Sequence, residues 1–201
     1  MKKIVLSLLG VGLLATLVDA DVFEMDPAHT EVAFAVRHMG ISIVRGTFNE
    51  FGGSLEYQPD DMQVVGGSIT IQVASVDTRI ARRDADLRSP RFLDAKTYPT
   101  ITFLSTRVEK RDGEYKLYGD LTIRGITHEV AFDSEVFGPV VMDEEGHSRL
   151  GFQGVATIDR RDWGLLFDEK VFGGEAAVGN EVTIRITTEG AVDQLHRGAY
   201  Q

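Results

Sequence analysis

Apolar and polar residues alternate with a period of two through most of this sequence, and that alternation sets the fold class. In "TEVAFAVRHM", residues 30–39, the side chains of Val32, Phe34 and Val36 share one face with His38. Successive side chains of a β-strand point to opposite faces, so this stretch predicts a strand with one apolar face. Comparable stretches are "IVRGTFNEF", "GSLEYQ", "SITIQVASV", "TITFLSTRV", "EYKLYGDLTI", "EVAFDSEV", "RLGFQGVATI" and "EVTIRITTE". The sequence therefore predicts an all-β protein with eight or nine strands.

The connections between these stretches are short and rich in glycine or charge, as in "RGIT", "KRDGE" and "DEEGH". Hairpin-length connections between consecutive strands indicate an antiparallel meander, which leaves a sandwich or a barrel. Glycines inside strands mark bulges or bends where a sheet curls. Because Gly46, Gly119, Gly151 and Gly154 all fall inside predicted strands, we favour the barrel.

One segment, residues 77–99, departs from the alternation and predicts a short helix. Asp77 or Thr78 suits its N-cap, and Ser89 with Pro90 suits the start of a second short helix. The residues at helical spacing on one face are Ile80, Asp84 and Leu87. Such a thin apolar stripe covers the rim of a barrel but does not build a separate domain.

The first twenty residues predict a cleaved secretory signal peptide. Lys2 and Lys3 precede an apolar stretch from Ile4 to Val18, and "VDA" ends at Ala20 with a small residue. The alternative is a retained anchor, which needs about 20 apolar residues. We therefore expect a single mature domain over residues 21–201.

Composition narrows the function classes. The chain has 21 Lys and Arg against 31 Asp and Glu, a formal charge of −10, which argues against non-specific attraction to nucleic acid or to anionic lipid surfaces. It has no cysteine, which excludes disulfides, thiolate nucleophiles and thiolate metal sites.

The histidines and serines form no catalytic or metal-binding motif. None of the five histidines stands at the spacing of a helical zinc pair, and no Gly-x-Ser-x-Gly elbow occurs. We expect no metal, no cofactor other than a bound ligand, and no catalytic residue. The histidines are His29, His38, His128, His147 and His196.

Two clusters near the predicted rim are open to a binding interpretation. The first is basic and consists of Arg79, Arg82, Arg83, Arg88 and Arg91. It is either a clamp for a polar head group or a solvated face paired with nearby aspartates. The second, "RRDWGLLFDEKVFGG", contains the only tryptophan among several apolar residues, which belong either to the core or to a ligand wall.

Four ordered blocks of the sequence resemble the YceI-like family of exported polyisoprenoid-binding proteins. They are "DPAHTEVAFAVRHMGISIVRGTFNEFGGSL", "RDADLRSPRFLDAKTYPTITFLST", "YGDLTIRGITHEVAFD" and "GFQGVATIDRRDWGL". The resemblance implies an eight-stranded antiparallel lipocalin-like barrel with a short helix near its opening. It also implies an apolar lumen that holds a long isoprenoid or other long-chain lipid, and a periplasmic location.

The sequence departs from the family pattern at two places. Thr30 stands where the family often has Ser, and Ala85 with Asp86 replaces a pair that often contains His, so this loop supplies no imidazole. An eight-stranded barrel is about wide enough for one small ligand. The residues expected to contact the ligand are Phe34, Val36, His38, Phe48, Phe51, Leu87, Arg88, Phe92, Phe103, Leu121, Ile123, Phe132, Phe152, Ile158 and Trp163. Arg37 or Arg45 would serve with His38 at the rim.

Three functions fit these expectations. The first is a non-enzymatic periplasmic protein that holds, stores or transports a polyisoprenoid lipid of the quinone or polyprenyl phosphate type. The second is an enzyme acting on such a lipid with His38 or His29 as acid-base group. The third is an adaptor of a membrane redox or stress-response complex. Transient contact with a membrane or with membrane redox proteins, and a homodimer, are compatible with the first.

Overall fold

The computed structural model describes residues 20–59, 63–144, 147–167, 169–170, 174 and 176–192 of the 201-residue chain. The predicted signal peptide lies outside the described residues except for Ala20, and the first strand begins directly after it. The strands are β1 (Asp21–Met25), β2 (Glu31–His38), β3 (Ser42–Phe48), β4 (Phe51–Gln58), β5 (Gln63–Gln72), β6 (Val76–Asp77), β7 (Thr100–Arg111), β8 (Glu114–Ile123), β9 (Ile126–Val141), β10 (Ser148–Asp159) and β11 (Val178–Val192). The helices are α1 (Ala81–Arg88) and the 3₁₀ turns η1 (Pro27–His29), η2 (Val73–Ser75) and η3 (Arg160–Trp163).

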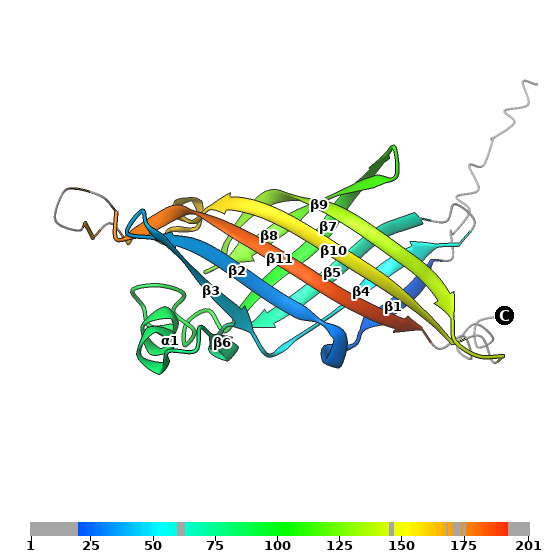
Figure 1. Ribbon diagram of the computed structural model, residues 1–201, viewed down its shortest axis with the longest axis horizontal. Coiled ribbons are helices and arrows are strands. Elements are labelled where there is room, and N and C mark those ends of the chain that lie inside the picture. Colours follow the sequence, from blue (N-terminus) through cyan, green and yellow to red (C-terminus); the bar gives the residue numbers. More distant parts are fainter. Residues whose placement is uncertain are drawn as a thin grey trace, which may run out of the picture.

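β11 closes the sheet into a barrel, because it pairs with β10 on one side and with both β1 and β2 on the other. β1 and β2 share one position in the wall, interrupted by η1, and β3 and β4 share the next. With β5, β7, β8, β9, β10 and β11 the wall has eight positions, all antiparallel (Figure 1). The predicted eight-stranded antiparallel barrel is confirmed.

The break between β1 and β2 has a local cause. The Asp26 carboxylate accepts a hydrogen bond from the backbone N–H of Ala28 at 3.0 Å, and Pro27 opens the turn. Proline has no N–H to give to a ladder, and an Asp cap satisfies the start of the turn instead.

The wall is incomplete beside β3. β4 pairs with β5 from Phe51 to Gln58, whereas on the same side β3 has only the two-residue strand β6, through Thr47 and Phe48. α1 follows β6 directly, and Figure 1 shows both beside β3 at one end of the barrel. The predicted short helix near the opening is therefore present.

Two of the predicted glycine positions are required by close packing inside the barrel. A Cβ on Gly46 would lie 2.5 Å from the Phe34 ring, and a Cβ on Gly119 would lie 2.4 Å from the Phe103 ring. Gly119 also faces an irregularity in the β7–β8 register, as expected for a bend in a curled sheet.

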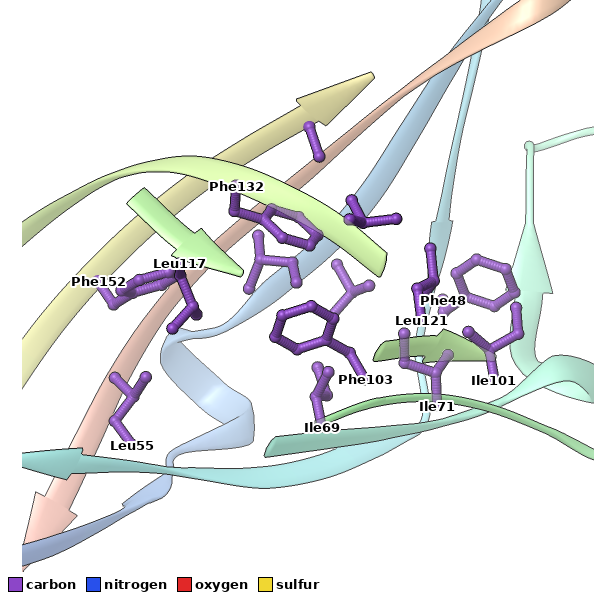
Figure 2. Packing of buried hydrophobic residues seen from close by; sticks show 14 of the residues in the cluster. Phe48, Leu55, Ile69, Ile71, Ile101, Phe103, Leu117, Leu121, Phe132 and Phe152 are labelled. Carbon is purple, nitrogen blue, oxygen red and sulfur yellow. The ribbon is translucent and has the colours of Figure 1, made fainter. Parts of the chain in front are cut away.

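The alternating residues point inward as predicted and form the core. The buried set includes Leu117 and Leu121 of β8, Phe132 of β9 and Phe152 of β10. Figure 2 shows these side chains converging in the interior. The period-two pattern is thus explained by one apolar lumen shared by all wall strands.

The segment around α1 differs from its prediction in two respects. α1 begins at Ala81, and neither Asp77 nor Thr78 caps it; instead Asp84 Oδ1 accepts from the Thr78 N–H at 2.8 Å and from its hydroxyl at 2.5 Å. The second short helix expected at Ser89 and Pro90 is wrong. The chain turns back there, with the Leu93 N–H donating to Leu87 O at 2.9 Å.

This turn brings apolar side chains from the end of the segment to the barrel, which a continuing helix would not do. Leu87 and Leu93 both pack against the core. No helix among the described residues has the length and apolar content needed to cross a membrane.

Candidate functional site

An apolar cavity of about 150 Å³ lies inside the barrel at the end covered by α1. Its walls include Phe34 of β2, Ile69 of β5 and Ile184 of β11, and Leu87 and Phe92 close it from the α1 side. Among the described residues that line it, every side chain except that of Arg160 is apolar. An apolar cavity of about this size stays free of water and takes up a small hydrocarbon.

Ten of the residues expected to contact a ligand line this cavity. They are Phe34, Val36, Phe48, Leu87, Phe92, Phe103, Leu121, Ile123, Phe132 and Ile158. They come from β2, β3, the α1 segment, β7, β8, β9 and β10, so the fold gathers side chains that are far apart in sequence. Their contact with a ligand stays a prediction.

Other lining residues were not among those expected. Ile69, Ile71 and Ile101 lie on the inward face of β5 and β7, and Val182 and Ile184 on that of β11. The alternation places them inside, but does not say which residues reach the end of the barrel that holds the cavity. Leu93 and Leu165 line it from loops, where no periodic pattern exists.

Three expected residues are apolar but lie outside the cavity lining. Phe152 borders a second void of only about 20 Å³ toward the other end of the barrel, and Phe51 packs against the core. Trp163 is buried and donates its indole N–H to Leu121 O at 3.1 Å, with its ring edge-on to His128. Because its N–H is used this way, Trp163 fastens η3 to β8.

The two expected polar residues also lie outside the lining. Arg88 donates to Ala74 O and Val76 O, both at 2.7 Å, and so ties α1 to the barrel. His38 is the last residue of β2, opposite Ser42 in the β2–β3 hairpin.

The Phe103 and Phe132 rings form the floor of the cavity. Their centroids are 5.2 Å apart in an edge-to-face arrangement, and both residues border the cavity on one side and the 20 Å³ void on the other. Figure 2 shows these rings between Leu117 and Phe152 on one side and Phe48 and Ile101 on the other. The floor therefore separates an open half of the lumen from a filled half.

Arg160 is the polar residue that sequence reasoning missed at the cavity. It is buried, and its guanidinium donates to the backbone oxygens of Gly179, Leu165, Phe167 and Val178 and to Asn180 Oδ1. These bonds hold the β10–β11 connection against the start of β11. A charged residue in a charged stretch gives no sequence signal of burial.

Three residues of the basic cluster, Arg83, Arg88 and Arg91, are not arranged as a clamp. Arg83 donates to the hydroxyl and carbonyl oxygens of Thr78, and Arg91 pairs with Asp86 and Glu169 while its guanidinium lies 5.3 Å from the Phe167 ring centroid. With Arg88 they fix the α1 segment over the cavity. The structural interpretation of the cluster therefore holds for these three arginines.

Histidines and carboxylates near the barrel ends do not form a reactive group. His29 contacts the Asp26 carboxylate at 2.9 Å, away from the cavity, and no described histidine lines the cavity. Hydrogen bonds from Arg149 and then His29 lower the pKa of Asp26 from its usual 3.8 to about 2. Among the described residues, no three His, Asp or Glu side chains gather to hold a metal ion.

A closed antiparallel barrel with an apolar cavity at one end belongs to the class of small-ligand-binding barrels. Comparison with known proteins narrows this class. The YceI-like domain profile matches residues 23–190. A UPF0312 protein of Pectobacterium atrosepticum is 35% identical over 172 residues, covering 84% of this chain and 89% of the relative. One from Vibrio cholerae is 33% identical over 192 residues, covering 92% and 97%. The chain belongs to the YceI-like family.

Solved structures show the same fold. The YceI protein of Campylobacter jejuni is 27% identical with a TM-score of 0.67, covering 78% of this chain and 89% of that one. BcnA of Burkholderia cenocepacia is 24% identical with a TM-score of 0.69, covering 82% and 98%. A polyisoprenoid-binding domain from Saccharophagus degradans, 13% identical, has a TM-score of 0.59 and covers 86% and 98%. The family and these neighbours share the barrel fold of this chain.

Proposed function

We propose that this protein holds and carries a long-chain isoprenoid lipid, of the quinone or polyprenyl phosphate type, in the cavity under α1. The observation that carries the proposal is the apolar cavity of about 150 Å³, lined by side chains from most wall strands. The neighbour described as a polyisoprenoid-binding domain supports the ligand class through its fold.

The energetics suit a hydrocarbon tail. Burial gains roughly 0.8 kcal/mol for each methylene before the costs of association. A few isoprene units therefore supply the affinity without a strong polar anchor. The part of a long chain that the cavity does not take lies against Leu87 and Phe92 at its mouth.

The role we propose needs no catalysis. The enzymatic alternative used His38 or His29 as acid-base group, and neither side chain lines the cavity. The lipid enters and leaves unchanged, through transient contact with a membrane.

We propose a periplasmic location on the strength of the signal-like residues 1–20. Expression of the full sequence, followed by cell fractionation and mass measurement of the purified protein, tests it. The expected result is a periplasmic protein that begins at Asp21. A cytoplasmic protein that keeps Met1 or Lys2 would contradict it.

The carrier proposal is tested by what the protein binds. Native mass spectrometry of the purified protein, with extraction of any co-purified lipid, should show one apolar ligand per chain. A protein that is purified empty and takes up no prenyl alcohol from solution would overturn the proposal.

A matched pair of variants locates the binding. Ile158 lines the cavity from β10, while its neighbour Thr157 is exposed on the outer face of the same strand. Ile158→Trp fills the cavity and should weaken prenyl alcohol binding about tenfold or more, because overpacking strains the site. Thr157→Trp should leave the affinity unchanged.

A further inference from the structure

Exposed apolar side chains gather at the tip of the β2–β3 hairpin. Ile41 is 84% exposed, and Ile43 and Met39 are 45% and 40% exposed. Leu166, in the β10–β11 connection, is 69% exposed. We refer to Met39, Ile41, Ile43 and Leu166 as the tip patch. A cluster of exposed large apolar residues marks an interaction surface more often than scattered single residues do.

The tip patch borders the mouth of the cavity. The Met39 N–H donates to Ala177 O at 3.1 Å, and the Ala177 N–H donates to Glu169 O at 2.8 Å, so the hairpin tip is fastened to the β10–β11 connection. That connection contributes Leu165 to the cavity, directly before Leu166. Figure 1 shows the hairpin tip, the start of β11 and α1 at the same end of the barrel.

Arginines flank the tip patch on the outer face. Arg37 lies opposite Ile43 in the β2–β3 ladder, and Arg45 follows two residues later on the same face. A surface groove runs from Ile43 and Arg45 to Arg79, before α1, and three arginines line it against two acidic residues, Glu31 and Asp77, the third arginine being Arg185. Within the described part of the chain, none of Arg37, Arg45 and Arg79 has an ion-pair partner within 4.0 Å.

The β2–β3 hairpin, which carries Met39, Ile41 and Ile43, has a charge opposite to that of the chain as a whole, whereas the segment around Leu166 contains basic and acidic residues in equal number. Residues 36–48 contain two arginines and no acidic residue, in a chain whose formal charge is −10. Guanidinium groups beside exposed apolar side chains match a bilayer that carries anionic head groups, because the arginines pair with phosphates while the apolar tips enter the interface.

A second exposed apolar tip serves as an internal comparison. The β9–β10 hairpin exposes Val141 at 65%, together with Val140 and Met142. Residues 129–144 contain five acidic residues and no basic one. An anionic surface repels this tip, so exposure of apolar side chains alone does not make it a membrane site.

We propose that the tip patch, with Arg37, Arg45 and Arg79, docks the mouth of the barrel onto a membrane that contains anionic phospholipid. The inference rests on the proposed carrier function, for which it supplies the site of lipid exchange. Docking by this end places the cavity mouth next to the acyl chains. A hydrocarbon tail then moves between membrane and barrel with little exposure to water.

The test measures binding to vesicles by co-sedimentation. Protein expressed from the full sequence is mixed with vesicles of phosphatidylcholine and phosphatidylglycerol, or of phosphatidylcholine alone. Ile41→Glu should weaken binding to the mixed vesicles about tenfold, because it removes an inserting apolar side chain and adds a negative charge. Val141→Glu, the same change at the acidic tip, should have no effect. Equal losses in the two variants would overturn the proposal.

The contribution of the arginines to membrane docking is tested separately. Arg45→Glu should weaken binding to the mixed vesicles at least fivefold, and the wild type should bind phosphatidylcholine vesicles more weakly than mixed ones. Equal binding of the wild type to both kinds of vesicle would overturn the proposal. The proposal would also be overturned if the tip patch mediates self-association instead. In that case Ile41→Glu would change the mass of the protein measured by light scattering and would leave its binding to vesicles unaltered.

Failure of docking is distinguishable from failure of the carrier function. Binding of a fluorescent prenyl alcohol in the absence of vesicles reports on the cavity alone. Ile41 does not line the cavity, so Ile41→Glu should keep this binding. A wild type that docks on vesicles but binds no prenyl alcohol would refute the carrier function. A wild type that binds the alcohol but shows no preference for mixed vesicles would refute the docking surface.

Discussion

The two halves of the barrel interior are built from the same kinds of side chain but differ in how completely they are filled. Beyond the aromatic floor, Phe23, Leu150 and Phe152 are buried, and the void there is about 20 Å³. On the α1 side the cavity measures about 150 Å³. We refer to these as the filled half and the open half.

The difference follows from the wall. In the filled half, β1 pairs with β4, and β4 pairs with β5 along its whole length with one register shift between Glu56 and Tyr57. In the open half, β3 pairs with β2 on one side but meets only the two-residue β6 on the other, where a short helical segment takes the place of a wall strand. A wall of paired strands allows the side chains inside it to pack densely, whereas a gap covered by a short helical segment leaves space between them. We infer that the filled half supplies stability and the open half supplies binding.

The largest effect should come from truncating the filled half. Phe23 is 1% exposed and lies edge-on to Tyr57, so Phe23→Ala should lower the free energy of unfolding by about 3 to 5 kcal/mol. Phe92→Ala, at the half-buried mouth, should cost about 1 kcal/mol or less, because its surroundings already contain space. Urea denaturation measures both. Similar costs at the two positions would contradict the division between the halves.

The floor between the halves should set how much chain the barrel takes. Phe103→Ala removes one ring of the pair and joins the cavity to the small void behind it. We expect about tenfold tighter binding of longer prenyl alcohols relative to short ones, because more methylenes are buried. Binding measured across a series of chain lengths checks this. An unchanged preference would show that the floor does not limit the ligand.

The hydrogen bonds by which Arg88 holds α1 to the barrel should control how fast a bound lipid leaves the open half. Arg88→Met removes the bonds to Ala74 O and Val76 O, whereas Arg82→Met changes an exposed side chain on the same helix. Losing two charge-assisted bonds should speed dissociation of a prenyl alcohol severalfold, by up to about tenfold. Stopped-flow displacement measures the rate. If Arg82→Met changes the dissociation rate equally, the hydrogen bonds of Arg88 do not control release.

The smallest effect should concern pH and lie at the end opposite α1. Arg149 and His29 hold the pKa of Asp26 at about 2, below its usual 3.8, so the ionised carboxylate stabilises the folded chain. This stabilisation is present above about pH 4 and is lost as the pH falls through about 2. The free energy of unfolding of Asp26→Asn should therefore lie below that of the wild type near neutral pH and approach it in acid. A constant difference across this range would contradict the assignment.

The alternation predicts nine of the eleven strands in the described part of the chain and their inward faces, and the glycines inside strands favour the barrel, because these features depend on the local pattern of side chains; the short strands β1 and β6 were not predicted. It does not predict which inward residues line the cavity: Phe152 and Ile158 share one face of β10, yet only Ile158 reaches it. Position along the barrel axis depends on strand tilt and register, which are properties of the closed sheet.

Residues in the short helices and in the loops were predicted least well, for a different reason. Arg160 and Arg88 bind backbone oxygens that only the folded chain brings close, at residues 178–179 and 74–76. The turn after Leu87 likewise follows from the packing of Leu93 against the core, where Ser89 and Pro90 alone favoured a helix. Tertiary contacts override local propensity in such segments.

The most direct test of this account is a methyl-labelled NMR titration of the protein with a prenyl alcohol. The methyl signals of Ile71, Ile123 and Ile158 in the open half should shift in a saturable manner, while those of Leu55 and Leu150 in the filled half should stay in place. Equal shifts in both halves, or shifts confined to surface methyls, would contradict the claim that the open half is the lipid site.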